Sequence, residues 1–114
     1  MEYLYLANFA NEFSVPEKGI LSHVLHKDAY VNITAFGFTA GEDLSSHASP
    51  TPAILQFLEG EAEVGLGDDT VLVQAGSLIY MPPHLPHSIS AKTPVKMLLV
   101  QMKAVDGILN IGVP

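Results

Sequence analysis

The chain contains no cysteine and no arginine among its 114 residues. Without cysteine there is no disulfide, no thiol catalysis and no thiolate zinc site. Without arginine, the chain lacks the guanidinium fork that binds phosphate or carboxylate ligands in a bidentate manner. Five lysines oppose twelve acidic residues, which gives a net charge of −7. Binding to nucleic acid is therefore not expected, because it relies on cationic side chains that neutralise phosphates.

Long apolar runs are also missing. The purely apolar stretches, such as Met97 to Val100, are no longer than four or five residues, far short of the roughly 20 residues that span a bilayer. The chain begins with Met1, Glu2 and Tyr3 and so lacks the basic start of a secretory signal peptide. These features predict a protein of the cytoplasm that does not associate with membranes.

What the chain does have is a high share of hydrophobic residues. Hydrophobic residues make up 48% of the 12.2 kDa chain and charged residues only 15%, against a usual charged share of about 25%. A chain of this size buries about two-thirds of its surface on folding, which is enough for one domain spanning residues 1–114. A surface so poor in charge predicts that a second copy of the chain covers part of it, as a homodimer.

Nine glycines and eight prolines divide the chain into short segments with the spacing typical of turns between strands. The pattern predicts strands over Ile20–His26, Ala29–Phe38, Ala53–Leu58, Glu61–Leu66, Val71–Val73, Leu78–Met81, His87–Ala91 and Val95–Lys103. A tight hairpin turn is expected at Gly67-Asp68-Asp69. Only Leu4–Phe13, within an N-terminal arm over residues 1–16, favours a short helix. Many short strands in one small domain predict an all-β sandwich or barrel.

The five histidines are the residues with the most specific chemistry. His23 and His26 lie in the first predicted strand, and the other three lie in two segments framed by glycine and proline: Gly41-Glu-Asp-Leu-Ser-Ser-His47-Ala-Ser49 and Gly76-Ser-Leu-Ile-Tyr-Met-Pro82-Pro-His84-Leu-Pro86-His87. Imidazole is the commonest metal ligand in proteins. Two histidines from strands far apart in the sequence can meet inside a barrel.

These two segments resemble the two motifs of the cupin superfamily. The first motif, G-x5-H-x-H-x3–4-E-x6-G, is similar to the stretch from Gly41 through His47 to Gly60, and the second, G-x5-P-x-G-x2-H-x3-N, to the stretch from Gly76 through Pro82 to His87. The resemblance implies an antiparallel double-stranded β-helix, or jelly-roll barrel, over residues 19–103. It also implies frequent dimerisation and, in members with a full motif, a divalent metal held by three histidines and one glutamate.

This chain departs from the motif at several ligand positions. His47 and His87 are retained, but Ser49 stands in place of the second histidine and Ala53 in place of the glutamate. His84 occupies the usual glycine position and Ala91 the usual asparagine position. The resemblance therefore implies, at most, a weak two-histidine site for a divalent transition metal such as Ni, Zn, Fe or Mn.

The alternation of strand side chains bears on the other candidates. If Ala53 faces the interior, Leu55 and Phe57 face it too, and Gln56 faces away unless a bulge intervenes. We therefore expect a pocket formed by Ser49, Ala53, Leu55 and Phe57, with His84 at its rim. His23 and His26 occupy odd and even positions of one strand, so at most one of them is expected to face inward.

Three functions remain open at this level. The barrel could hold a small molecule, with or without a metal on His47 and His87. It could be a metal-dependent dioxygenase or isomerase acting on a small, weakly charged substrate, with a lid over Ser45–Pro52. Alternatively, it could be a metal-free binding protein or a structural dimer. A fold alone does not decide among these functions.

Overall fold

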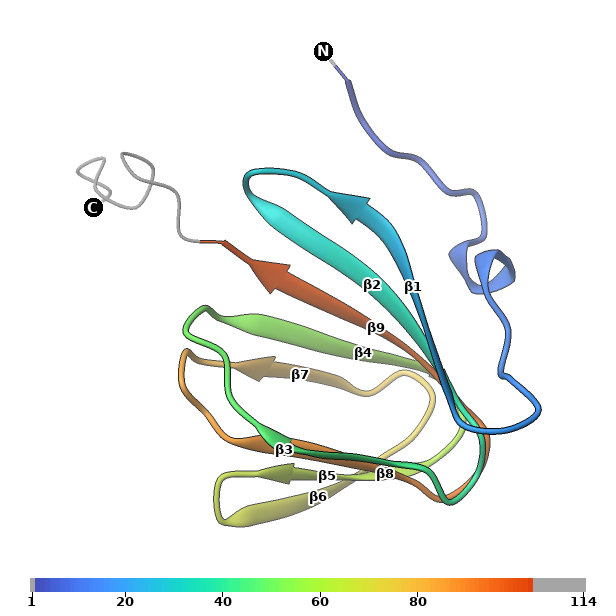
Figure 1. Ribbon diagram of the computed structural model, residues 1–114, viewed down its shortest axis with the longest axis vertical. Coiled ribbons are helices and arrows are strands. Elements are labelled where there is room, and N and C mark those ends of the chain that lie inside the picture. Colours follow the sequence, from blue (N-terminus) through green and yellow to red (C-terminus); the bar gives the residue numbers. More distant parts are fainter. Residues whose placement is uncertain (1, 104–114) are drawn as a thin grey trace.

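The computed structural model describes residues 2–103 and shows a sandwich of two antiparallel sheets (Figure 1). Sheet A has the strand order β1-β2-β9-β4-β7, and sheet B has the order β3-β8-β5-β6. The strands are β1 (Ile20–Lys27), β2 (Val31–Phe38), β3 (Asp43–His47), β4 (Ala53–Glu59), β5 (Ala62–Leu66), β6 (Asp69–Val73), β7 (Leu78–Met81), β8 (His87–Ala91) and β9 (Val95–Met102), preceded by the 3-10 helix η1 (Phe9–Glu12). Across the described residues, no helix has the length and apolar character needed to cross a membrane.

The predicted all-β architecture is confirmed, and each of the eight predicted segments overlaps one strand. The ninth strand, β3, lies where the sequence predicts a loop. Its residues Asp43–His47 include serine and aspartate, which have low strand propensity, so pairing with β8 must outweigh local preference. Because β3 extends to His47, the loop that could cover the barrel begins after that residue. The helix expected within Leu4–Phe13 is limited to the four residues of η1.

The core lies between the two sheets, because each strand turns alternate apolar residues inward. In β4, Ala53, Leu55 and Phe57 are buried while Gln56 is exposed, as the alternation predicts. The core cluster consists of Phe38, Ala53, Leu55, Phe57, Ala62, Val64, Val73, Met81, Ile89, Ala91, Val95 and Met97. Each large side chain buried in this way stabilises the fold by about 1.5–3 kcal/mol relative to its exposure.

Backbone conformation explains why glycines frame the two histidine segments. Gly41, Gly60 and Gly76 all have φ near +90°, a conformation that L side chains rarely adopt. At Gly60 a Cβ atom would also collide with the carbonyl oxygen of Pro94. His84, which stands where the motif has glycine, has a φ of 69° and is held in this conformation by the hydrogen bond from its backbone N–H to Ser49 O.

The N-terminal arm packs against the outward face of sheet A, on the side away from sheet B (Figure 1). Lys96 Nζ, on β9, donates to Ala10 O at 2.9 Å and lies 5.2 Å from the centre of the Phe13 ring. The arm lies close to β2 at Gly37, where an added Cβ would lie 2.5 Å from Ser14 O. The absence of a side chain at Gly37 therefore lets the arm backbone lie directly on the sheet.

We expect the substitution Gly37→Ala to lower the free energy of unfolding by about 1–3 kcal/mol, because the new methyl group would displace arm backbone rather than a mobile side chain. Gly65→Ala is a matched control, since its Cβ would meet only the hydroxyl of Ser88, which can rotate away. Urea denaturation of both variants measures the difference. Equal destabilisation by the two substitutions would contradict the close contact between arm and sheet.

The β1–β2 hairpin is closed by one carboxylate. Asp28 Oδ1 accepts hydrogen bonds from the backbone N–H groups of Tyr30 and Val31 at 2.8 and 2.9 Å, and Asp28 Oδ2 lies 2.8 Å from His26 Nε2. The hydrogen bond with His26 has the largest effect, and together these contacts lower the pKa of Asp28 from 3.8 to about 2. The ionised carboxylate is thus part of the folded hairpin.

This lowered pKa makes a prediction for acid stability. A carboxylate whose pKa is lower in the folded state stabilises it above the unfolded pKa, and this contribution is lost as the pH falls through the folded pKa. The difference in free energy of unfolding between wild type and Asp28→Ala should therefore shrink between pH 3.8 and about pH 2. Acid-dependent urea denaturation tests this, with the turn substitution Asp68→Ala as control. A difference that stays constant over that window would contradict the role of Asp28.

Candidate functional site

The candidate site is built around two histidines from neighbouring strands of sheet B. His47 is the last residue of β3 and His87 the first residue of β8, and the two are direct register partners. Their ring centres are 4.3 Å apart, with an angle of 57° between the planes. His87 is buried, at 7% exposure, while His47 is exposed. The pair therefore reaches from the protein surface into the interior of the sandwich.

A β-bulge in β3 decides which way His47 points. Leu44 pairs with Ile89 and His47 pairs with His87, so three steps along β3 match two steps along β8. Strict alternation would place Leu44 and His47 on opposite faces, because they are an odd number of residues apart. The one-residue bulge between them lets both side chains reach the same cavity.

Both imidazoles are held by the same local hydrogen bond. His47 Nδ1 lies 3.0 Å from Ser45 O, and His87 Nδ1 lies 3.0 Å from Leu85 O. A carbonyl oxygen only accepts, so each bond requires the proton on Nδ1 and leaves the Nε2 lone pair of a neutral ring free. Metal-binding histidines have this arrangement, in which the second nitrogen is oriented by a carbonyl or carboxylate.

The two rings line a cavity of about 170 Å³ between the sheets. The other lining side chains are all apolar and come from strands of both sheets: Phe36, Leu44, Leu55, Ile89, Met97 and Leu99. No carboxylate or lysine is among the residues that line this cavity in the described part of the chain. The site can therefore offer two imidazole nitrogens and otherwise only dispersion contacts.

The structure brings only some of the sequence candidates together. Leu55 lines the cavity with His47 and His87, whereas Ala53 and Phe57 are buried in the core beside it. Ser49 Oγ is 3.3 Å from Thr51 Oγ1, within the loop that follows β3. Gln56 lies on the outward face of β4 and is exposed.

His84 is exposed on the β7–β8 loop and does not line the cavity, although its backbone ties this loop to Ser49. In β1, a bulge between Val24 and His26 makes His23 pair with Ala35 and His26 with Ile33. Because Ala35 and Ile33 are two residues apart, both histidines lie on the same, outward face of sheet A. Because of the bulge, His23 and His26 face the same way, although simple alternation along the strand predicts opposite faces. Neither imidazole ring lines the cavity.

The residues around the pair allow a test of the four-ligand metal site that the motif implies. No group of three or more potential metal ligands occurs in residues 2–103. Ser49 contacts a neighbouring threonine, and Ala53 has no ligand atom. The full four-ligand site does not fit this chain, which leaves His47 and His87, each with Nδ1 bound to a carbonyl oxygen, as the remaining candidate ligands.

The cavity also contains residues that the sequence reasoning missed. Met97, Leu99 and Phe36 alternate regularly on their strands, so extending the inward-face argument from β4 to β2 and β9 could have found them. No such signal exists for Leu44, because the bulge in β3 is not visible in the sequence. On the same inward face of β2, Asn32 Oδ1 is buried with no hydrogen-bond partner in the described structure.

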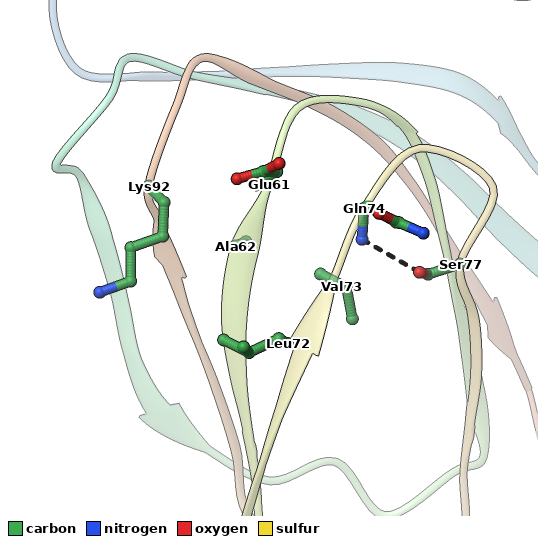
Figure 2. A pocket seen from close by; sticks show the side chains of 7 residues that line it. All are labelled: Glu61, Ala62, Leu72, Val73, Gln74, Ser77 and Lys92. Atoms are coloured by element: carbon green, nitrogen blue, oxygen red, sulfur yellow. Dashed lines mark hydrogen bonds between the residues drawn. The ribbon is translucent and has the colours of Figure 1, made fainter.

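A second hollow, of about 290 Å³, lies where β5 begins and β6 ends (Figure 2). It is lined by Glu61, Ala62, Leu72, Val73, Gln74, Ser77 and Lys92. The Gln74 backbone N–H donates to Ser77 Oγ at 3.0 Å, and Lys92 Nζ lies 3.4 Å from Glu63 Oε1. Ser77 and Lys92 thus have partners within the chain. The cavity with the two imidazoles is the better candidate site, because its polar groups come together within an apolar lining.

Comparison with known proteins agrees with this geometry. Residues 36–101 match the family described as Cupin domain, and this stretch includes every residue that lines the cavity, both histidines among them. No curated protein matches the chain.

Several solved structures are similar over most of their length. A conserved protein of unknown function from Streptococcus pyogenes is 30% identical, with a TM-score of 0.81 and 92% of each chain covered. A cupin superfamily protein from Desulfitobacterium hafniense is 24% identical, with a TM-score of 0.81 over 90% of this chain and 97% of that one. KdgF from a Halomonas species is 20% identical, with a TM-score of 0.72 over 79% of this chain and 85% of that one. At such identities, the last two similarities show a shared fold alone.

Proposed function

Because the chain belongs to the Cupin domain family, we propose that its barrel binds a small, uncharged and mainly apolar molecule beside His47 and His87. The cavity lining carries this proposal, since it combines six apolar side chains with two convergent imidazoles. Ligand sites usually have this composition, with a few polar groups that fix orientation. A charged ligand would lose its hydration without meeting a counter-ion among the described lining residues.

The cavity volume limits the ligand to about one ring. An apolar cavity of about 150 Å³ accommodates benzene, and this one measures about 170 Å³. The apolar body of the ligand would pack against Phe36 and Leu55. A hydroxyl or N–H group would donate to Nε2 of His47 or His87, because these atoms are the free acceptors of the cavity lining.

Phenol serves as a probe because it joins one ring to one hydroxyl donor. We expect phenol to shift the NMR signals of His87 and Leu55, and benzoate, with the same ring and a negative charge, to leave them unchanged. Leu55→Phe should abolish the phenol shifts by filling the cavity, whereas Leu72→Phe, on the outside of β6, should preserve them. Equal binding of benzoate, or phenol binding that leaves these signals unmoved, would refute the proposal.

A divalent transition metal on the two Nε2 atoms is the second candidate, favoured by the hydrogen bonds that orient both rings through Nδ1. His47 and His87 would hold the ion and leave its remaining positions to water or ligand. When bound, such a metal would supply Lewis-acid polarisation of a ligand oxygen. The role of the chain would be to fix both rings and to exclude water from the apolar side of the cavity.

Calorimetric titration of the untagged, chelator-treated protein with Ni²⁺ and Zn²⁺ tests this second candidate. We expect one equivalent to bind, and His47→Ala or His87→Ala to weaken binding by at least about tenfold, because either change leaves one protein ligand. His84→Ala is the control and should bind as the wild type does, since its ring does not line the cavity. Unchanged affinity in His87→Ala would rule out the two-histidine site and leave the metal-free binding function.

A further inference from the structure

Two carboxamide side chains lie side by side on the inward face of sheet A, next to the cavity. β2 and β9 pair in unbroken register, and Asn32 and Gln101 are direct partners in it. Because strand side chains alternate, Asn32 shares the inward face of β2 with Phe36, and Gln101 shares that of β9 with Leu99. Phe36 and Leu99 line the cavity, so the two carboxamides continue its lining along the strands.

This pair lies at the end of the sandwich where the cavity opens to solvent. His47 lines the cavity and is exposed at the end of β3. Gln101 pairs with Ala53, the first residue of β4, which follows β3 after a short loop. Figure 1 shows the end of β9 and the start of β2 at this same end of the molecule. Asn32 and Gln101 are both half-buried there.

The side chain of Asn32 has an unmet hydrogen-bonding need. Its Oδ1 atom is buried and has no hydrogen-bond partner within the described part of the chain. Most buried polar atoms are paired, and an unpaired acceptor disfavours the folded state. The last torsion of an asparagine side chain is broad, and Asn32 as a whole is only half-buried. The carboxamide can therefore turn its oxygen toward the opening and accept a hydrogen bond from a bound molecule.

The two side chains together match the hydrogen-bonding groups of an amide. Asn32 Oδ1 accepts a hydrogen bond, and the amide nitrogen of Gln101 donates one. A primary amide offers an N–H and a C=O in this complementary way, whereas a carboxylate has no donor for Asn32. Lys27, the partner of Asn32 on β1, is the charged residue in this row, and it is exposed. Water and salt screen its attraction for an anion.

From this arrangement we infer that the ligand of the barrel is an apolar ring joined by a short chain to a neutral carboxamide. The ring occupies the cavity, Asn32 Oδ1 accepts the amide N–H, and Gln101 donates to the amide C=O. Gln101 lies two residues beyond Leu99, about 7 Å along the strand, which a spacer of about two methylene groups can cover. This inference rests on the binding function proposed for the cavity and adds the chemical class of the ligand.

Three probes with the same ring and spacer test the carboxamide site. They are 3-phenylpropanamide, its N,N-dimethyl derivative, which has no N–H, and 3-phenylpropanoate, which has a negative charge. NMR titration of the intact chain measures the three affinities. We expect the primary amide to bind about tenfold more tightly than either of the others, because only the amide pairs the acceptor on Asn32. It should also shift the side-chain NH₂ signals of Asn32.

The substitution Asn32→Leu should abolish the preference for the primary amide over its dimethyl derivative and leave the binding of phenol unchanged. Gln56→Leu is the control, because it removes an exposed carboxamide from the outward face of the same sheet and should keep the preference. Asn32→Leu should also melt no lower than the wild type, since leucine has no acceptor to leave unpaired. A lower melting temperature would show that Asn32 supports the fold and would overturn its role as a ligand contact.

The binding of phenol separates this inference from the function on which it rests. If phenol binds but the three probes bind equally, or the carboxylate binds best, the carboxamide site is wrong and the apolar cavity stands as a binding site. If neither phenol nor the primary amide binds, both the proposed function and the carboxamide site are refuted.

Discussion

In strands that bury one face, side chains must alternate between the interior and the outside, and this constraint organises the whole molecule. It places Ala53, Leu55 and Phe57 in the core and Gln56 outside. It also creates a lumen whose lining comes from both sheets. Where the alternation is broken by a single extra residue, the break has a consequence: the bulge in β3 lets Leu44 and His47 share one cavity.

The chemistry of the site follows from what lies between the sheets. Two imidazoles with Nδ1 bound to carbonyl oxygens offer two Nε2 lone pairs to an apolar cavity. Serine and alanine at two ligand positions of the motif remove the atoms that would complete a strong metal site. Such an arrangement favours weak, open coordination or a hydrogen bond to a neutral ligand over tight binding of an ion.

The outward faces of the two sheets differ in the side chains that they carry. The outward face of sheet B presents serine, threonine, aspartate and glutamate with one leucine, whereas that of sheet A presents isoleucine, leucine, valine and tyrosine together with His23, His26 and Lys96. The exposed apolar side chains are therefore not spread evenly but lie mainly on the outward face of sheet A. The arm packs on that side over β1, β2 and β9, and Gly37 allows its backbone to lie against β2.

The sequence by itself determined the all-β class, eight of the nine strands and the face on which the β4 residues lie, because turns and alternation are local properties. It also determined that His47 and His87 are the retained imidazoles. Only the tertiary structure decided that these rings are 4.3 Å apart, that Leu44 joins them and that His84 does not line their cavity. It likewise placed His23 and His26 on one outward face through a bulge. Register and bulges depend on pairing between strands distant in the chain, so no local pattern encodes them.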